Sequence, residues 1–293
     1  IWDEPNRRLI LARDRIGEKP LFYSIQGEKL LFASETKALT GKGFVSPQID
    51  PIALTSYLTY GYVAEPHSIF SGISKLPAAH ILIYDESGLR TQRYWQLNKT
   101  PDNSITPAEA VSETRRLTDV SVASRLTSDV PLGYFLSGGL DSSVVVGSAA
   151  QNSKSKLKTF SIGFEEKSYS ELEYANTVAN HFGTDHHEFI VTADLTSDLE
   201  SIVRFADEPF ADSSMIPMYY LSGQASQHVT VALTGDGGDE AFAGYDRYIG
   251  LTIANRYHNI PSLVRKNLIS PITRMIRESP GKRGNLRRIK RLT

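Results

Sequence analysis

Cysteine is absent from the 293 residues of this chain. Its absence excludes disulfide bonds, thiolate metal sites and a cysteine nucleophile within these residues. Long apolar runs are absent as well, since none approaches the roughly 20 residues that span a bilayer. The amino-terminal residues do not resemble a signal peptide either. We therefore expect a cytoplasmic protein that has no membrane partner.

An excess of charge is also absent from the chain as a whole, whose net charge is −1. The charge is uneven, however, because residues 251–293 carry eleven Lys or Arg and one acid, Glu278. Such a basic end is compatible with nucleic-acid binding, but no aromatic residues alternate with the charges to stack on bases. We prefer a solvated helix face or a linker and expect no nucleic-acid partner. A nucleic-acid-binding module stays as the remote alternative.

Two patterns divide the chain into a strand-rich segment, residues 1–98, and a mixed segment, residues 105–293. The first contains short strands joined by turns, in RRLILARD, LFYSIQGEKLLFAS and HILIYDESGLRTQRYW. Polar residues and proline between Lys99 and Pro107 mark the boundary. The chain opens at Ile1 in what reads as the middle of a strand, so we expect a fragment of a longer protein.

Strands and helices alternate regularly after this boundary. Strands are expected at 130–136, 157–164, 186–191 and 229–234, and helices after Thr106, at 141–151, after Ser170 and at 213–226. Thr106 with Glu109, and Ser170 with Glu173, each have the spacing of a capping box. Short apolar strands that alternate with helices predict an α/β fold with a parallel sheet covered on both faces.

Ligands of such sheets bind beyond the carboxyl ends of the strands. Leu136, Ile162 and Thr234 each lie where an expected strand runs into a loop. The first loop, SGGLDSS at 137–143, has glycines that let backbone N–H groups approach an anion at the start of a helix. It lacks the Gly-Lys-Ser/Thr of the mononucleotide-binding loop and the Gly-x-Gly-x-x-Gly of the dinucleotide-binding turn.

Asp141 lies inside this anion-binding loop. Because its carboxylate would repel a bound phosphate, a cation must lie between the two. Mg²⁺ prefers oxygen ligands and is usually held by one or two carboxylates. Alternatively, Asp141 simply favours the positive end of a helix, an effect of about 0.3–1 kcal/mol. The second glycine-rich loop, TGDGGDE at 234–240, adds Asp239 and favours a shared Mg²⁺–polyphosphate site.

The loop SGGLDSS is similar to the pyrophosphate-binding loop of the N-type ATP pyrophosphatases. Together with LTGDGGDE and FAGYDRY, it makes the chain resemble the class B, glutamine-dependent asparagine synthetases. The resemblance implies an ATP pyrophosphatase domain, related to the adenine nucleotide alpha hydrolases, over 105–293 and incomplete at its C-terminus. ARDRIGEKPLFY and FASETKAL resemble the closing strands of a β-rich, Ntn-type class II glutaminase domain, of which residues 1–98 would be the C-terminal part.

The resemblance also implies roles for individual residues. Asp141 and Asp239 would hold Mg²⁺ on the pyrophosphate, and Asp236 would act in forming and capturing the activated carboxylate. The remaining residues of the ATP and pyrophosphate site would be Leu136, Ser137, Gly138, Gly139, Ser142, Ser143, Ile162, Thr234 and Gly235. The relatives' glutaminase cysteine would lie upstream of Ile1, and their catalytic lysine downstream of Thr293.

The implied reaction is adenylation of the aspartate side chain by ATP, with release of pyrophosphate, followed by attack of ammonia derived from glutamine. A related adenylating amidotransferase or a β-lactam-forming cyclase is the alternative. Asp207-Glu208 and Asp212 lie where relatives build the amino-acid pocket, but capping of a helix explains these acids equally well. Homo-oligomerisation is left open.

The adjacent His186 and His187 are expected on opposite faces of a strand, as ordinary histidines and not as ligands of one metal ion.

Overall fold

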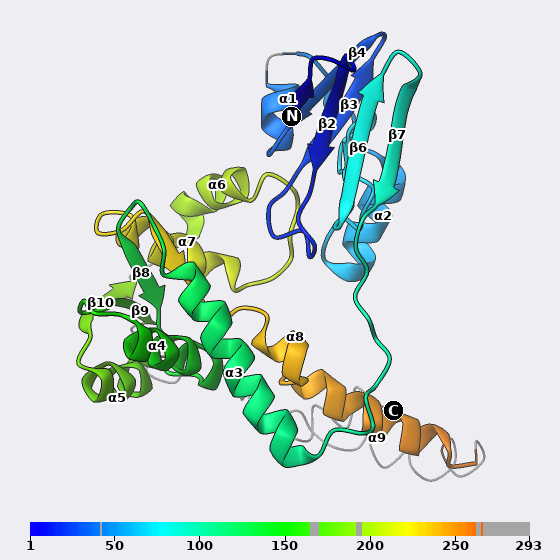
Figure 1. Cartoon of the computed structure of the whole chain (residues 1–293). Helices are drawn as coiled ribbons and strands as arrows, with labels where there is room; N and C mark the ends of the chain where they lie inside the picture. The colour runs from blue at the N-terminus through cyan, green and yellow to red at the C-terminus, as the bar shows by residue number, and fades with distance from the viewer. Residues whose placement is uncertain (42, 165–169, 192–194, 262–264, 266–293) are drawn as a thin grey trace. The chain divides into compact units, whose positions relative to one another are not determined.

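The computed structural model describes residues 1–41, 43–164, 170–191, 195–261 and 265 (Figure 1). The chain divides into two compact units. The first contains residues 1–116, 162–170 and 189–227, and the second contains residues 117–161, 171–188 and 228–293. Among the described helices, none is long and apolar enough to cross a membrane.

The strand-rich segment of the first unit forms two antiparallel sheets. One has the order β1-β2-β6-β7, and its strands are β1 (Trp2–Asp3), β2 (Arg8–Ala12), β6 (His80–Asp85) and β7 (Gly88–Arg93). The other has the order β4-β3-β5, from β3 (Phe22–Gln26), β4 (Lys29–Ala33) and β5 (Ser74–Lys75). The predicted strands and both predicted hairpin turns are confirmed, because Gln26 pairs with Lys29 and Asp85 pairs with Gly88.

The described helices that lie entirely within this unit are α1 (Thr36–Thr40), α2 (Pro51–Tyr60), α6 (Leu195–Ala206) and α7 (Met215–Ala225). The helix α7 corresponds to the one expected at 213–226, whereas α6 was not expected. The signal was present, since Leu199, Ile202 and Val203 recur at helical spacing and Ile202 is buried.

The parallel sheet has the strand order β10-β9-β8-β11. Its strands are β8 (Leu132–Phe135), β9 (Lys158–Phe164), β10 (Asp185–Val191) and β11 (Val231–Leu233), and β8 pairs in parallel with both β9 and β11. The chain passes from β8 through β9 to β10 and then returns to β11 on the other side of β8. The strand order therefore reverses at β8, which makes the carboxyl ends of β8 and β11 the position where a ligand is expected.

The remaining described helices are α3 (Pro107–Arg125), α4 (Leu140–Asn152), α5 (Leu172–Phe182), α8 (Gly238–Phe242) and α9 (Asp246–His258). The capping box of Thr106 is confirmed, since its backbone N–H donates to Glu109 at 2.9 Å and its hydroxyl accepts from the Glu109 N–H at 3.3 Å. The capping box of Ser170 is wrong. Glu171 occupies the N-cap position of α5 and its side chain makes no capping hydrogen bond, because the helix begins one residue later than the box requires.

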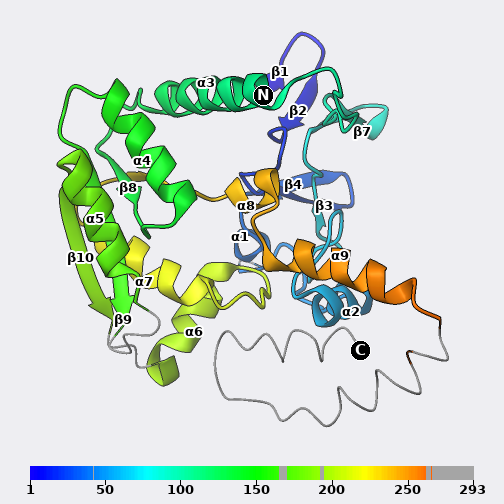
Figure 2. The ribbon, with the colours of Figure 1, turned by 90° about the horizontal axis from the view of Figure 1, so that it is seen from below.

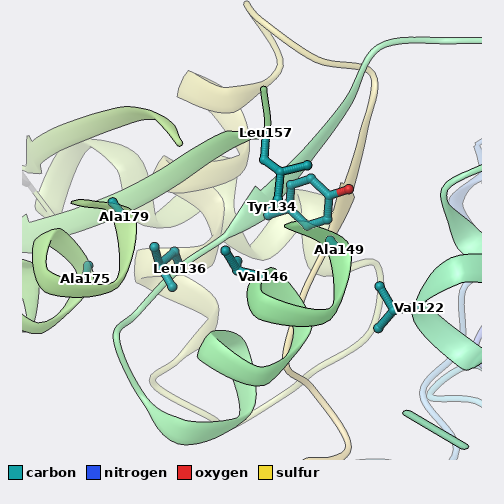
Figure 3. Close-up of a cluster of buried hydrophobic side chains, with 8 residues drawn as sticks. All are labelled: Val122, Tyr134, Leu136, Val146, Ala149, Leu157, Ala175 and Ala179. Carbon is teal, nitrogen blue, oxygen red and sulfur yellow. The ribbon is translucent and has the colours of Figure 1, made fainter. Parts of the chain in front are cut away.

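A core of eight buried residues fixes α4 and α5 against the parallel sheet (Figures 2 and 3). Tyr134 and Leu136 come from β8 and the residue after it, Val146 and Ala149 from α4, and Ala175 and Ala179 from α5; Val122 and Leu157 complete the set. Burial of these side chains determines where the loop between β8 and α4 lies.

Candidate active site

The loop after β8 turns sharply at Gly138 and enters α4 at Leu140. Gly138 has φ of +77°, a conformation that L residues rarely adopt, and a Cβ built on it would lie 2.5 Å from carbon atoms of Tyr174. The backbone of the loop therefore lies directly against the first turn of α5. Only glycine fits this position without displacing the loop.

The serines of this loop bond mainly to the loop itself. The Ser142 hydroxyl donates to the Gly139 carbonyl at 3.2 Å and accepts from the Ser137 N–H at 3.3 Å, and the Ser143 hydroxyl donates to the same carbonyl at 2.6 Å. The Ser137 hydroxyl in turn lies 3.0 Å from that of Ser142. These contacts hold the loop in shape, and the proposed part of the serines in pyrophosphate binding stays a prediction.

Backbone N–H groups are the donors that this loop leaves available. Those of Gly138, Leu140 and Asp141 have no hydrogen-bond partner within the residues that the structure describes. The last two belong to the first turn of α4, whose N–H groups have no carbonyl partner within the helix and carry its positive dipole end. The arrangement suits an anion with several oxygen atoms.

The loop after β11 packs against the start of α4. A Cβ on Gly235 would lie 2.6 Å from the Ser142 nitrogen, and a Cβ on Gly238 would overlap the Asp141 carboxylate. Gly244 is similarly required beside the Asp239 carboxylate. Gly235 and Gly238 of the second loop thus bring its backbone against the start of α4 and the Asp141 carboxylate.

Asp141, Asp239 and Glu240 form one electrostatic cluster. Burial raises the pKa of Asp141 above its ordinary value, and the negative charges of Asp239 and Glu240 raise it further. In the described part of the chain, neither Asp141 nor Asp239 has a hydrogen-bond donor or a cation for its carboxylate. Two partly buried carboxylates that repel one another fit a hard divalent cation. No group of three or more potential metal ligands occurs in the described ranges, so the remaining ligands of such a cation would come from phosphate and water.

Thr234 and Asp236 lie in the same loop. The Thr234 hydroxyl donates to Asp236 at 2.9 Å and accepts from the Asp236 N–H at 3.3 Å, which holds the exposed Asp236 carboxylate in place. Leu136 is 1% exposed and its side chain lies in the core, so any contact with a nucleotide would use its backbone. Ile162 lies in β9, two residues before its end. The roles predicted for these residues stay predictions.

Two of the acids ahead of α7, Asp207 and Glu208, bind other segments of the first unit. Asp207 accepts the N–H of Thr36 at 2.5 Å, and Glu208 pairs with Lys75 at 2.6 Å. Asp207 thus caps α1, a helix distant in sequence, and a role of these acids in an amino-acid pocket stays a prediction.

The two histidines point to opposite faces of β10, as predicted. His186 lies 2.8 Å from the Thr159 hydroxyl, whereas His187 stacks on Phe160 with ring centroids 5.2 Å apart. Burial lowers the pKa of His186 below its ordinary value.

Comparison with known proteins decides the family. Residues 113–291 match the family described as asparagine synthase, and residues 1–95 match a glutamine amidotransferase domain. The chain belongs to the asparagine synthase family. It is 35% identical over 92% of its length to asparagine synthetase (glutamine-hydrolyzing) 1 of Bacillus subtilis, covering 42% of that protein.

Other relatives show the same partial coverage. The chain is 36% identical to the putative asparagine synthetase (glutamine-hydrolyzing) 2 of Methanocaldococcus jannaschii, over 90% of this chain and 52% of that one. It is 31% identical to amidase chyE of Penicillium rubens, over 90% of this chain and 42% of that one. The chain thus spans about half, or less, of the length of these curated relatives.

Proposed function

We propose that the protein carrying this chain is a glutamine-hydrolysing asparagine synthetase and that the chain supplies its ATP pyrophosphate site. The strongest support is that the glycine loops after β8 and β11 meet where the strand order of the sheet reverses. There the carboxylates of Asp141 and Asp239 repel one another beside backbone N–H groups that have no partner in the described part of the chain. Relatives named asparagine synthetase that match nine tenths of the chain add to the support.

In the proposed reaction, the carboxylate of aspartate attacks the α-phosphate of ATP and pyrophosphate leaves. Ammonia then attacks the acyl adenylate, and asparagine, AMP and a proton are the products. The backbone N–H groups of Gly138, Leu140 and Asp141 would bind the departing pyrophosphate, with no reorganisation needed during the reaction. The Ser137–Ser142–Ser143 hydrogen bonds would keep these donors in position.

We assign Asp141 and Asp239 as the carboxylates that hold Mg²⁺ at this site. When bound, Mg²⁺ would neutralise charge on the pyrophosphate oxygens. Leu136, Ile162, Thr234 and Gly235 are proposed to bind the adenosine of ATP. Asp236, held by Thr234, is proposed to accept a proton from the attacking ammonia.

The nucleotide product tests this proposal. The full-length protein, given ATP, Mg²⁺, aspartate and ammonia, should release AMP and pyrophosphate, as measured by anion-exchange chromatography. Asp141→Asn should reduce AMP formation by about 10²-fold or more, since several kcal/mol of charge stabilisation is lost. Its unfolding free energy should not fall, because the repulsion from Asp239 and Glu240 is removed.

The matched control is Asp129→Asn, an acid that lies exposed in the loop ahead of β8. It should leave AMP formation unchanged. ADP as the nucleotide product, or full activity of Asp141→Asn, would contradict the proposal.

A second candidate is amide synthesis on a different carboxylate, since one relative that matches 90% of the chain, amidase chyE, carries a name that specifies amide chemistry but not aspartate. The two candidates differ in whether AMP release requires aspartate. AMP release that depends on another carboxylic acid, and not on aspartate, would establish the second.

A further inference from the structure

Ser161 lies in β9, outside both glycine loops, yet its hydroxyl reaches the start of the first one. The residue is 2% exposed, and its hydroxyl donates a hydrogen bond to the carbonyl of Leu136, directly before the loop SGGLDSS. Burying a hydroxyl costs free energy unless it is hydrogen-bonded, so a serine in the core is expected to have a specific partner. Ser161, Leu136 and the loop all belong to the second unit.

This bond continues the connection between β8 and β9 beyond the end of their backbone ladder. The parallel pairing of the two strands ends at Phe135 and Phe160. Leu136 follows, and its N–H still donates to the Phe160 carbonyl at 2.8 Å. Its own carbonyl then accepts from the side chain of Ser161. A backbone bond and a hydroxyl bond thus hold the strand end at which ligands of a parallel sheet bind.

The peptide group between Leu136 and Ser137 is held at both of its ends. Its carbonyl accepts from the Ser161 hydroxyl, and its N–H, which belongs to Ser137, donates to the Ser142 hydroxyl at 3.3 Å. A peptide group is planar and rotates as a unit, so bonds at both ends fix its orientation. The next peptide group carries the N–H of Gly138, which has no hydrogen-bond partner in the described part of the chain. The direction of that free donor therefore depends on the group that Ser161 holds.

The loop itself supplies little restraint at this point. Glycine adopts a wide range of backbone conformations, so Gly138 and Gly139 allow the loop to rotate. The hydroxyls of Ser137 and Ser142 bond to each other and to the loop backbone. Ser161 differs because it belongs to a strand that is paired within the sheet. Its hydrogen bond connects the loop to a rigid element, and binding sites supported in this way are the most precise.

We propose that Ser161 is a positioning residue for the pyrophosphate of ATP. By holding the peptide group between Leu136 and Ser137, it keeps the Gly138 N–H directed at the phosphate oxygens before the reaction starts. Donors that are already in position stabilise developing charge without reorganisation during the reaction. The inference rests on the proposed function and adds to it a residue from outside the two glycine loops.

The first test compares Ser161→Ala with wild type in the full-length protein, given ATP, Mg²⁺, aspartate and ammonia. The kcat/KM of AMP formation for ATP should fall by about tenfold, which is less than the roughly 10²- to 10³-fold lost when such a donor is removed outright. The donor is still present in this variant, and only its direction changes. The affinity for pyrophosphate with Mg²⁺, measured by isothermal titration calorimetry, should weaken as well, whereas the KM for aspartate should not change.

Thr159→Val is the matched control for the loss of a buried hydroxyl. Thr159 is fully buried and lies two positions before Ser161, on the same face of β9. Its hydroxyl lies 2.7 Å from that of Thr184 and 2.8 Å from His186 Nδ1, neither of which belongs to the loop. The two changes should lower the unfolding free energy similarly, since each removes one partner of a buried hydrogen bond.

Only Ser161→Ala should weaken pyrophosphate binding and lower kcat/KM for ATP. Equal losses in the Thr159→Val control would show that Ser161 acts through stability alone, and they would overturn the proposal.

Ser142→Ala releases the other end of the same peptide group. Either single change already frees the group to rotate, so the double variant should lose less pyrophosphate affinity than the product of the two single losses. A loss equal to that product would contradict the proposal, because the two hydroxyls would then act on separate parts of the loop.

Hydrogen exchange tests the hold on the peptide group without any activity. The amides of Leu136 and Ser137 should exchange faster in Ser161→Ala than in wild type, and at the wild-type rate in Thr159→Val. Unchanged exchange in Ser161→Ala would overturn the hold, and faster exchange with unchanged pyrophosphate affinity would overturn its role in positioning. If wild type binds pyrophosphate but releases no AMP, the proposed function fails, whereas the affinities of the variants still decide whether Ser161 positions the anion donor.

Discussion

Gly138→Ala should destabilise the protein through a steric overlap that can be separated from the backbone effect. An alanine in the left-handed region costs about 1–2 kcal/mol. In addition, its Cβ would lie 2.5 Å from two carbon atoms of Tyr174. Carbon atoms prefer separations of about 3.5–4.0 Å, so the loop or α5 must move by about 1 Å. Overpacking of this kind costs about 1–3 kcal/mol, which gives a total loss of about 2–5 kcal/mol.

Gly183→Ala is the matched control for the backbone effect. Gly183 ends α5 with φ of +63°, and no atom lies within 4 Å of a Cβ built on it. This change should therefore cost only the conformational part, about 1–2 kcal/mol. The difference between the two variants, about 1–3 kcal/mol, corresponds to roughly 2–12 °C in Tm for a domain of this size.

Urea unfolding followed by circular dichroism measures both losses, provided that the m-value stays constant. Gly138→Ala should also reduce ammonia-dependent AMP formation at temperatures where it remains folded, because the N–H groups of the loop are displaced. Gly183→Ala should not. Equal losses of stability in the two variants would refute the steric argument.

Two further predictions concern a helix cap and a buried histidine. Thr106→Ala should lower the unfolding free energy by about 1 kcal/mol, because the capping box with Glu109 is lost. The control Ser112→Ala, on the exposed face of α3, should change the unfolding free energy little. Equal effects of the two changes in urea unfolding would argue against the cap. The lowered pKa of His186 means that the unfolded chain takes up a proton first as the pH falls below the ordinary value of 6.5. The stability that His186 contributes is complete above that pH and is lost as the pH falls through the lowered pKa. His186→Asn should thus flatten the decline in unfolding free energy between about pH 7.5 and about pH 5, and an unchanged slope would show that other groups cause it.

Features that depend on residues close in sequence were predictable. The capping box of Thr106 lies within three residues, and the hairpin turns at Gly27 and Gly88 need only their own strands. The positions of the two glycine loops were predictable for the same reason. A glycine-rich turn directly after an apolar strand indicates an anion site at the edge of a parallel sheet. The absence of cysteine excludes a whole class of nucleophile without any structure.

Features that depend on distant contacts were decided only by the tertiary structure. The Ser170 box has the right spacing, but in the folded chain α5 begins at Leu172 with Glu171 at its N-cap position. The pKa of Asp141 rises because burial combines with acids about a hundred residues later in the chain. Asp207 and Glu208 show the limit most clearly, since their partners lie 171 and 139 residues away. A carboxylate accepts any nearby N–H group, and the sequence specifies which groups it could bind, but only the folded chain determines which of them come within reach.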